Sequence, residues 1–359
     1  MSHDPVRVAI VGCGNIAGHY AAQICAYPEL ELVGATDLDL ARAEALTAEH
    51  GGKAYASLDE LLADPSVTIV VNLAIHHVHY AITKQCLEAG KHVHSEKPLA
   101  LTAAEAHDLV AIAAANNVRL GSSPFTWMGE AQQTAWKQIR DGKIGDVRAV
   151  YAEVNHGRIE AWHPNPGPFY DVGPWFDVGV YPLTLLSTFF GPVQWIQAHA
   201  QVLYPDRRTK EGVDFHIDTP DFLLATLQLA DGPIVRLTCN FYVHRANTRQ
   251  AGIEFHGDKG SLHLGSWQGF GTEVTMSDFG EPLAAVPLLR EGPEGTDWGR
   301  AIQDMAIAIR EDRPHRATGA QAAHVVEVLA AGIQSSADQG RRVAITSTFD
   351  RPAPVDWGV

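Results

Sequence analysis

Hydrophobic residues follow two different periodicities in the two parts of the chain. Up to about residue 122, short runs rich in β-branched residues alternate with longer stretches in which Ala and Leu recur at helical spacing. This alternation is typical of βαβ units around a parallel sheet. The expected strands are Val6–Val11, Leu30–Thr36, Val67–Ala74, His92–Ser95 and Val118–Ser122, and the expected helices are Asn15–Tyr27, Leu40–His50, Leu58–Ala63, Tyr80–Ala89 and Thr102 to about Asn116.

The pattern changes near Ser123, where strands become longer, alternate in polarity and are joined by hairpin turns. The expected strands are Val147–Asn155, Val193–Leu203, Phe222–Leu229, Ile234–Val243, Gly252–His256 and Ser261–Leu264, with helices at Glu130–Asp141, Val180–Phe190, Trp298–Arg310 and Gly319–Asp338 covering one face. The predicted fold class is therefore α/β. We expect a doubly wound parallel sheet in residues 1–122 and a mainly antiparallel sheet with helices in residues 123–359.

Composition narrows the classes of function. A chain of 359 residues with 42 acidic and 27 basic side chains has a formal charge of -15, which disfavours nucleic acid and anionic membranes as partners. Apolar runs such as 67–75 are far shorter than the roughly 20 residues that span a bilayer. The four cysteines have no paired spacing and residues 1–6 are polar, so free thiols and a cytoplasmic location are expected.

A glycine-rich segment follows the first predicted strand. Residues 12–17 read Gly-Cys-Gly-Asn-Ile-Ala, which matches G-x-G-x-x-G/A between a strand and a helix. Such glycines allow a pyrophosphate to approach the backbone at the helix N-terminus. Asp37, at the end of the second strand, would bind the ribose hydroxyls of the adenosine and repel a 2'-phosphate, which predicts NAD as the cofactor. A purely structural glycine turn is the alternative.

A second polar group, Glu96-Lys97-Pro98, follows the strand His92–Ser95, at the edge where open α/β sheets bind ligands. Lys97 could hold its ammonium near a substrate hydroxyl and lower the pKa of that hydroxyl. By itself, a Lys beside a Glu is more often a surface ion pair.

Three segments resemble the Gfo/Idh/MocA family of oxidoreductases: the glycine loop 12–17, residues 90–100 (Gly-Lys-His-Val-His-Ser-Glu-Lys-Pro-Leu-Ala) and residues 176–181 (Phe-Asp-Val-Gly-Val-Tyr). The resemblance implies an N-terminal Rossmann domain and a C-terminal α/β domain with a large open sheet, used for substrate binding and oligomerisation. It also implies hydride exchange between a nicotinamide and a carbinol carbon of a sugar, sugar derivative or cyclitol. Dimers or tetramers are expected.

By position, Lys97 is similar to the family's catalytic lysine, and Asp177 and Tyr181 match its D-x-x-x-H/Y pair. The tyrosine form resembles dihydrodiol and xylose dehydrogenases. A phenol acts as a base near neutral pH only beside a cation, for which Lys97 is the candidate. Asp177 and Tyr181 are four residues apart at the start of a predicted helix, so both can face one cleft. A helix-capping Asp and a core Tyr are the structural alternatives.

The chain departs from the family pattern at two places. Residues 171–173 read Asp-Val-Gly where many members have three glycines, and residues 74–79 read Ala-Ile-His-His-Val-His in place of Thr-Pro-Asn before a histidine. His76 stands at the position of that Asn and faces either the ribose or substrate on one view, or caps a helix or faces solvent on the other. The expected cofactor contacts are Gly12, Gly14, Asn15, Ile16, Asp37, Ala74, His76, His79, Glu96 and Lys97.

Residues 156–166 form an irregular segment rich in Pro and aromatic residues before Asp177. Trp162 and His163 there offer an apolar surface with hydrogen-bonding groups, which suits a sugar ring. The expected substrate contacts are Lys97, Trp162, His163, Asp177 and Tyr181. No metal-binding spacing is found among the histidines, so no metal is expected.

Three functions are compatible with these residues. The first is an NAD-dependent dehydrogenase acting on CH–OH groups. The second is a redox-neutral glycosidase that retains NAD, oxidises a ring carbon transiently and eliminates the aglycone. The third is a non-enzymatic nucleotide-sensing module, which leaves Lys97, Asp177 and Tyr181 without a shared purpose. We favour the first.

Overall fold

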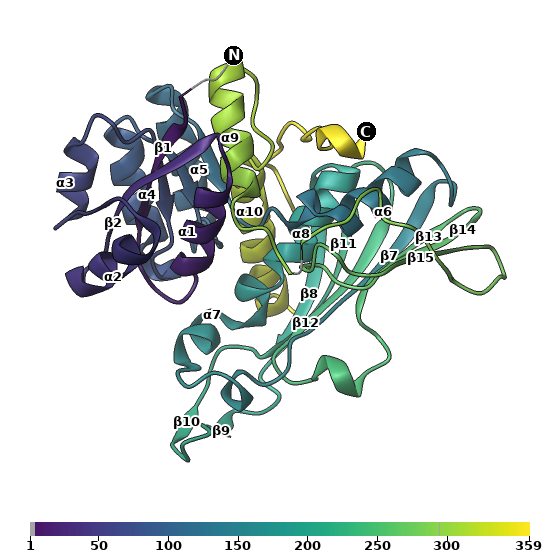
Figure 1. Ribbon diagram of the computed structural model, residues 1–359. Coiled ribbons are helices and arrows are strands. Elements are labelled where there is room, and N and C mark those ends of the chain that lie inside the picture. Colours follow the sequence, from purple (N-terminus) through teal and green to yellow (C-terminus); the bar gives the residue numbers. More distant parts are fainter. Residues whose placement is uncertain (1–3, 294) are drawn as a thin grey trace. The chain divides into compact units, whose positions relative to one another are not determined.

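The computed structural model describes residues 4–293 and 295–359 and divides into two compact units (Figure 1). Unit 1 comprises Met1–Phe125 and Asp297–Val326, and unit 2 comprises Thr126–Thr296 and Glu327–Val359. The first segment of unit 1 therefore ends three residues beyond the expected boundary at residue 122. Unit 1 also contains a later segment, Asp297–Val326, which was expected in the second domain.

Unit 1 is built on a six-stranded parallel sheet in the order β3-β2-β1-β4-β5-β6. Its strands are β1 Val6–Val11, β2 Leu30–Thr36, β3 Lys53–Ala54, β4 Ile69–Asn72, β5 His92–Ser95 and β6 Leu120–Ser122. The helices are α1 Ala17–Ala26, α2 Leu40–His50, α3 Leu58–Ala63, α4 His79–Glu88, α5 Ala103–Ala115 and α9 Arg300–Glu311, with a 3-10 turn η1 at His76–Val78. This is the predicted doubly wound sheet.

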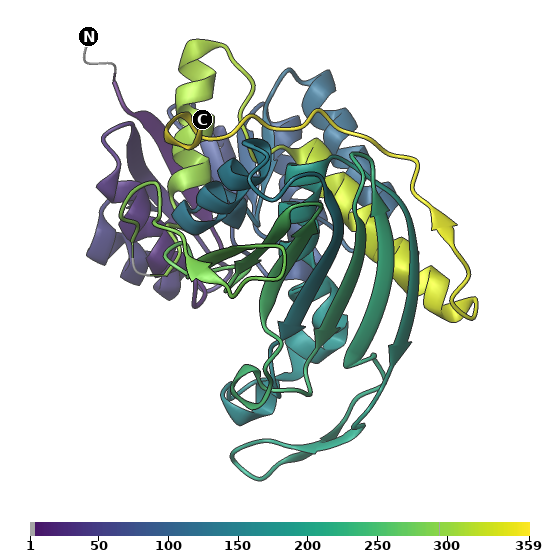
Figure 2. The same ribbon diagram turned by 90° about the vertical axis from the view of Figure 1, so that its right-hand side faces the viewer.

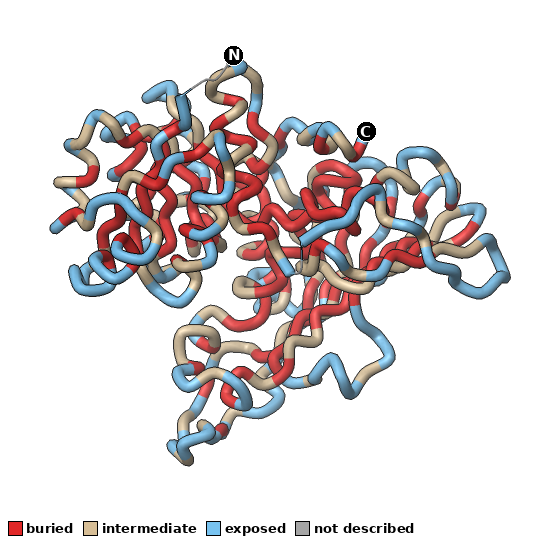
Figure 3. The backbone as a smooth tube through the Cα atoms, in the orientation of Figure 1, coloured by how far each residue is buried: buried red, intermediate tan, exposed pale blue. Residues whose placement is uncertain are grey.

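Two hydrophobic clusters flank this sheet, and its central strands are buried (Figure 3). One cluster joins Val8 and Ile10 of β1 to α1 and to Ile302 and Met305 of α9. The helix expected at Trp298–Arg310 was therefore wrongly assigned to the second-domain sheet. Its amphipathic pattern specifies an apolar face but not the sheet against which that face packs.

Two strands are shorter than expected because local hydrogen bonds turn the chain. The run Val67–Ala74 contracts to β4, since the Asn72 side chain accepts a hydrogen bond from the backbone N–H of Ala74 at 3.2 Å. The run Val118–Ser122 contracts to β6, since Val118 closes the end of α5 by bonding the carbonyl of Ala113 at 3.0 Å. Thr102 caps α5, since its side chain accepts from the backbone N–H of Glu105.

Unit 2 is built on a nine-stranded sheet in the order β16-β15-β14-β13-β7-β12-β11-β8-β17, whose long strands are seen side by side in Figure 2. Only the pair β7 and β12 is parallel among the described strands of this sheet. The strands are β7 Val147–Asn155, β8 Val193–Gln201, β11 Phe222–Leu229, β12 Ile234–Asn240, β13 Gly252–Gly257, β14 Gly260–Leu264, β15 Val274–Asp278, β16 Ala284–Ala285 and β17 Val343–Ala344. The predicted mainly antiparallel sheet is confirmed.

Helices of unit 2 pack against this sheet, with α7 against β11 and β12, α8 against β11, and α6 against β14 and β15. Their bounds are α6 Glu130–Arg140, α7 Gly167–Asp177 and α8 Val180–Phe190, and a separate hairpin pairs β9 Asp206–Arg208 with β10 Asp214–His216. Helix α10, Gly319–Ala337, begins in unit 1 and ends in unit 2. None of the helices described here is both long and apolar enough to cross a membrane.

Candidate functional site

The glycine loop leaves β1 at Gly12 and enters α1. Gly12 has a φ of +91°, and a Cβ there would lie 2.7 Å from the backbone nitrogen of Ala74. Gly14 is different, because a Cβ there would meet nothing within 4 Å. Within the described chain, the backbone N–H groups of Gly14, Asn15 and Ile16 donate to no protein acceptor. The loop therefore offers an open cradle of N–H donors at a helix N-terminus, which fits a pyrophosphate.

Asp37 follows β2 and is bonded to this loop. Its Oδ2 accepts from the backbone N–H of Cys13 at 2.7 Å, and its Oδ1 accepts from that of Asp39 at 2.9 Å. The carboxylate is therefore oriented by the backbone before any ligand binds. Burial, followed by the charge of Asp37, raises the pKa of the Cys13 thiol to about 12, so this thiol is no nucleophile at neutral pH.

The segment Glu96-Lys97-Pro98 follows β5 and is held from several sides. The backbone N–H of Glu96 donates to the carbonyl of Asn72 at 2.8 Å, which continues the sheet. Glu96 is only 8% exposed, and its two carboxylate oxygens accept from the Tyr20 hydroxyl at 2.5 Å and from the Lys97 backbone N–H at 3.0 Å. Glu96 is therefore a buried structural acceptor, unlike the carboxylate of a surface ion pair.

His79 connects two of the predicted cofactor-binding loops. It is buried, with Nδ1 lying 2.7 Å from the carbonyl of Pro98 and Nε2 lying 2.8 Å from the carbonyl of Ala74. Burial lowers the pKa of His79, so the ring is neutral near pH 7 and donates through one nitrogen at a time. Both ring nitrogens face protein carbonyls, which makes His79 a brace between loops. His76 lies on η1, half-buried, with its ring centroid 4.2 Å from that of His77.

Unit 1 thus gathers the predicted cofactor residues at one edge of its sheet. The glycine loop, Asp37, Ala74 and Glu96 each follow the carboxyl end of a strand, namely β1, β2, β4 and β5. The strand order reverses between β1 and β4. Ligands of open α/β sheets bind at this edge, beside the point of reversal. The residues present fit a dinucleotide.

Asp177 and Tyr181 belong to unit 2. Both were expected at the start of one helix, but Asp177 is the last residue of α7 and Tyr181 is the second residue of α8. The two residues between α7 and α8, Val178 and Gly179, keep near-helical dihedral angles, and the Tyr181 N–H donates to the carbonyl of Val178 at 3.2 Å. The break is therefore short. Gly173 (φ +68°) precedes Pro174 within α7 and kinks that helix.

A continuous aromatic surface extends from Tyr181. Its ring centroid lies 4.8 Å from that of Trp267, which in turn lies 6.5 Å from His156. His156 lies 5.7 Å from Trp162, and Trp162 lies 5.4 Å from His163. The structure therefore brings the predicted residues Tyr181, Trp162 and His163 into one ring cluster. Sequence analysis missed Trp267, since an isolated Trp in a loop between β14 and β15 carries no distinguishing spacing.

A buried ionic network supports the loop that carries Trp162. The Arg207 guanidinium donates to Glu160 at 2.9 Å, to the Tyr170 hydroxyl at 2.7 Å, and to Asp221. The side chains of Arg207 and Asp221 are completely buried. Burial and the hydrogen bond to Glu160 raise the pKa of Tyr170, so this tyrosine stays protonated and donates to Glu160. Tyr170 is therefore a structural residue.

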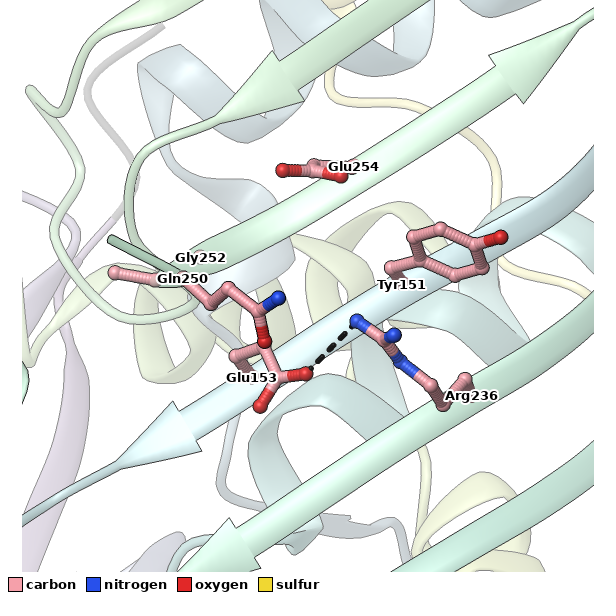
Figure 4. Close-up of a pocket in the computed structure, with 7 residues that line it drawn as sticks. Tyr151, Glu153, Arg236, Gln250, Gly252 and Glu254 are labelled. Atoms are coloured by element: carbon pink, nitrogen blue, oxygen red, sulfur yellow. Dashed lines mark hydrogen bonds and ion pairs between the residues drawn. The ribbon is translucent and has the colours of Figure 1, made fainter. Parts of the chain in front are cut away.

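A hollow on the nine-stranded sheet is lined by none of the predicted site residues (Figure 4). Figure 4 shows Arg236 of β12 beside Tyr151 and Glu153 of β7, with a 3.0 Å ion pair from Arg236 to Glu153. The guanidinium carbon also lies 4.2 Å from the Tyr151 ring centroid. Burial raises the pKa of Glu153.

Within the described residues, no group of His, Cys, Asp and Glu has the arrangement of a metal site.

Comparison with known proteins decides the family. A model described as "Oxidoreductase family, NAD-binding Rossmann fold" matches residues 6–123, and one described as "GFO/IDH/MocA C-terminal domain" matches residues 132–263. Human trans-1,2-dihydrobenzene-1,2-diol dehydrogenase is 30% identical over 263 residues, which cover 72% of this chain and 74% of that protein. The chain belongs to the Gfo/Idh/MocA oxidoreductase family. It therefore has an NAD-binding Rossmann domain, as the glycine loop and Asp37 predicted.

A further similar protein and a similar solved structure are named for other substrates. D-glucoside 3-dehydrogenase of Escherichia coli K12 is 24% identical over 361 residues, covering 96% of this chain and 99% of that protein. A solved structure of levoglucosan dehydrogenase, in complex with NADH and levoglucosan, superimposes with a TM-score of 0.81 at 18% identity, covering 95% of this chain and 99% of the other. At that identity, the likeness supports the shared fold alone.

Proposed function

We propose that this oxidoreductase is an NAD-dependent dehydrogenase that oxidises a secondary alcohol of a sugar, sugar derivative or cyclic polyol. The observation that carries the proposal is the Glu96-Lys97-Pro98 turn, which is fixed at the same sheet edge as the dinucleotide cradle. A lysine whose backbone is held at that edge is placed to contact a ligand that binds there. The relatives named for dihydrodiol and glucoside oxidation support the class of substrate.

When bound, NAD supplies the hydride acceptor. The chain's own residues do the rest: Lys97 hydrogen-bonds the substrate hydroxyl and stabilises the phenolate form of Tyr181, and Tyr181 takes the hydroxyl proton. Asp177 orients the substrate. A phenol has an ordinary pKa near 10, so removal of the Lys97 cation should lower the fraction of Tyr181 that is phenolate at neutral pH. The aromatic surface of Trp267, Trp162 and His163 binds the apolar faces of the ring.

The proposal is tested by following NADH absorbance with pentoses, hexoses, cyclic diols and glycosides. Lys97→Met and Tyr181→Phe should each lower kcat by about 10²- to 10⁴-fold, the usual contribution of a general base. Lys84→Met on α4 and Tyr55→Phe are matched controls, because neither residue belongs to the proposed site or to the proposed subunit interface. Wild-type turnover in either site variant removes that residue from the mechanism. Sugar release at constant absorbance would favour the redox-neutral glycosidase.

We further propose that NAD is preferred over NADP, because Asp37 is oriented by two backbone hydrogen bonds at the position expected for the adenosine ribose. A fixed carboxylate there repels a 2'-phosphate. Asp37→Ser should lower the ratio of kcat/KM with NAD to kcat/KM with NADP by at least tenfold. This corresponds to the loss of about 1.4 kcal/mol of discrimination between the two cofactors. An unchanged ratio contradicts this assignment.

We also propose that the chain forms a homo-oligomer through the open face of the nine-stranded sheet. The face carries Tyr151, Leu224 and Ile234, which are 39%, 38% and 44% exposed on neighbouring strands. Exposed apolar residues grouped on a sheet face mark interaction surfaces. Light scattering on the wild type and on Ile234→Lys is the test. A monomeric wild type refutes the proposal.

A further inference from the structure

A directional chain of hydrogen bonds runs through the interior of unit 1 and ends at Glu96. The Tyr20 hydroxyl donates its one proton to Glu96 Oε1 at 2.5 Å, so the contact of 3.0 Å between Tyr20 and Ser123 requires Ser123 to donate to Tyr20. Ser123 Oγ must then accept from His94 Nε2, at 3.2 Å. Every proton in this chain points toward the carboxylate.

The protonation of His94 agrees with this direction. His94 is completely buried, and burial lowers its pKa to about 3, so it is neutral near pH 7 and carries one ring proton. Its Nδ1 is buried and has no hydrogen-bond partner in the described chain. The proton therefore belongs on Nε2, where an acceptor exists. Hydrogen bonds arranged in one direction polarise and strengthen one another.

Glu96 passes this restraint to Lys97. Its second carboxylate oxygen accepts from the Lys97 backbone N–H at 3.0 Å, while the carbonyl of Pro98 lies 2.7 Å from Nδ1 of the His79 ring. The lysine is therefore braced on both sides, by α1 through Tyr20 and by α4 through His79. Tyr20 stands six residues after Gly14, on the helix that follows the dinucleotide loop.

We propose that Tyr20 is a positioning residue for Lys97: its hydroxyl fixes the Glu96 carboxylate, which fixes the Lys97 backbone. This inference rests on the proposed function, since it assigns Lys97 to the reaction. Without the hydroxyl, Glu96 Oε1 loses its donor and the carboxylate is free to rotate toward other donors. The Lys97 turn then loses the restraint that comes from α1, while the glycine loop and Asp37 keep their own hydrogen bonds.

The test compares Tyr20→Phe with Tyr55→Phe. Tyr55 is a matched control in the same unit, because it is also buried and its hydroxyl also donates to a carboxylate, Asp64, at 2.7 Å. Tyr20→Phe should lower kcat by about 10- to 100-fold, the equivalent of one hydrogen bond to a charged group. The KM for NAD should stay within about threefold of wild type, and Tyr55→Phe should keep kcat within about twofold. Equal kcat values in the two variants overturn the inference.

A spectroscopic arm works without turnover. After reductive methylation with ¹³C-formaldehyde, the dimethyl-lysine signal of residue 97 is assigned by its loss in Lys97→Arg. The signal should move in Tyr20→Phe and stay in place in Tyr55→Phe; a signal that is unmoved in Tyr20→Phe overturns the inference. If Tyr20→Phe does not fold, Ser123→Ala removes the preceding donor and should move the same signal by a smaller amount.

The two levels of hypothesis fail differently. Wild-type turnover of Lys97→Met refutes the proposed role of Lys97, and with it the reaction for which Tyr20 would matter. Loss of turnover in Lys97→Met together with wild-type turnover in Tyr20→Phe overturns the positioning role alone.

Discussion

The same substitution should affect different properties at the two glycines of the dinucleotide loop: stability at Gly12 and affinity for NAD at Gly14. Gly12→Ala places a Cβ 2.7 Å from Ala74 N, 2.8 Å from Leu73 C and 2.9 Å from Ala74 Cα, all of them backbone atoms that cannot turn away. The φ of +91° adds strain for an L-residue. Roughly 1–2 kcal/mol for the backbone conformation and about 1–3 kcal/mol for overpacking give a destabilisation of about 2–5 kcal/mol.

Gly14→Ala is the matched control, because its Cβ would meet nothing within 4 Å. We expect its free energy of unfolding to change by less than about 0.5 kcal/mol, as at other unconstrained surface positions. The same Cβ would stand in the space proposed for the pyrophosphate. Loss of one charge-assisted hydrogen bond, about 1.5–3 kcal/mol, should raise the Kd for NAD by about 10- to 100-fold.

Urea denaturation, hydrogen exchange of β1 and β4 peptides and titration calorimetry with NAD measure these effects. Gly12→Ala should lose protection in both strands, because β1 pairs with β4 from Val8 to Val11. A Gly12→Ala protein as stable as wild type would show that the backbone contact is easily relieved. A Gly14→Ala protein with unchanged affinity would show that the cradle does not hold the pyrophosphate.

Three further outcomes are expected. Arg207→Met should destabilise unit 2 by about 3–5 kcal/mol, measured by urea denaturation, because it leaves buried carboxylates without their cation. Arg207→Lys should recover only part of this stability. Full recovery would contradict a role for the planar guanidinium group. Burial lowers the pKa of His94 to about 3 and that of His315 to about 4, so only the unfolded chain takes up these protons between about pH 6.5 and 4. The free energy of unfolding should therefore decrease as the pH is lowered, by about 2 kcal/mol per histidine between pH 7.5 and 5, and a urea midpoint that is the same at these two pH values would refute the linkage. Gly173→Ala should lower turnover, because a Cβ at φ +68° would lie 2.8 Å from the carbonyl oxygen of Pro220 and would displace the kink of α7 before Asp177. Unaltered kinetics would show that the geometry of this kink does not matter for the site.

The sequence alone predicted the parallel sheet of unit 1 and the family, because both depend on local patterns. Strands such as Val6–Val11 and the helix Leu40–His50 were predicted to the residue, since a buried parallel strand and an amphipathic helix have distinct periodicities. The glycine loop, Asp37 and Lys97 were predicted as site residues because each follows a strand within a recognisable motif, and these roles stay predictions. The glycine loop and Asp37 lie within about 25 residues of each other along the chain. Lys97 lies in a segment that resembles the family.

Tertiary structure decided what depends on contacts between distant segments. Periodicity could not tell that α9 packs on unit 1, because an apolar helix face fits either sheet. Nor could it reveal that Tyr20 bonds Glu96 across 76 residues, or that Trp267 lies against Tyr181, because a tyrosine in a helix and a tryptophan in a loop have many possible neighbours. Pattern specifies which face of an element is buried; only the folded chain specifies which atoms that face meets.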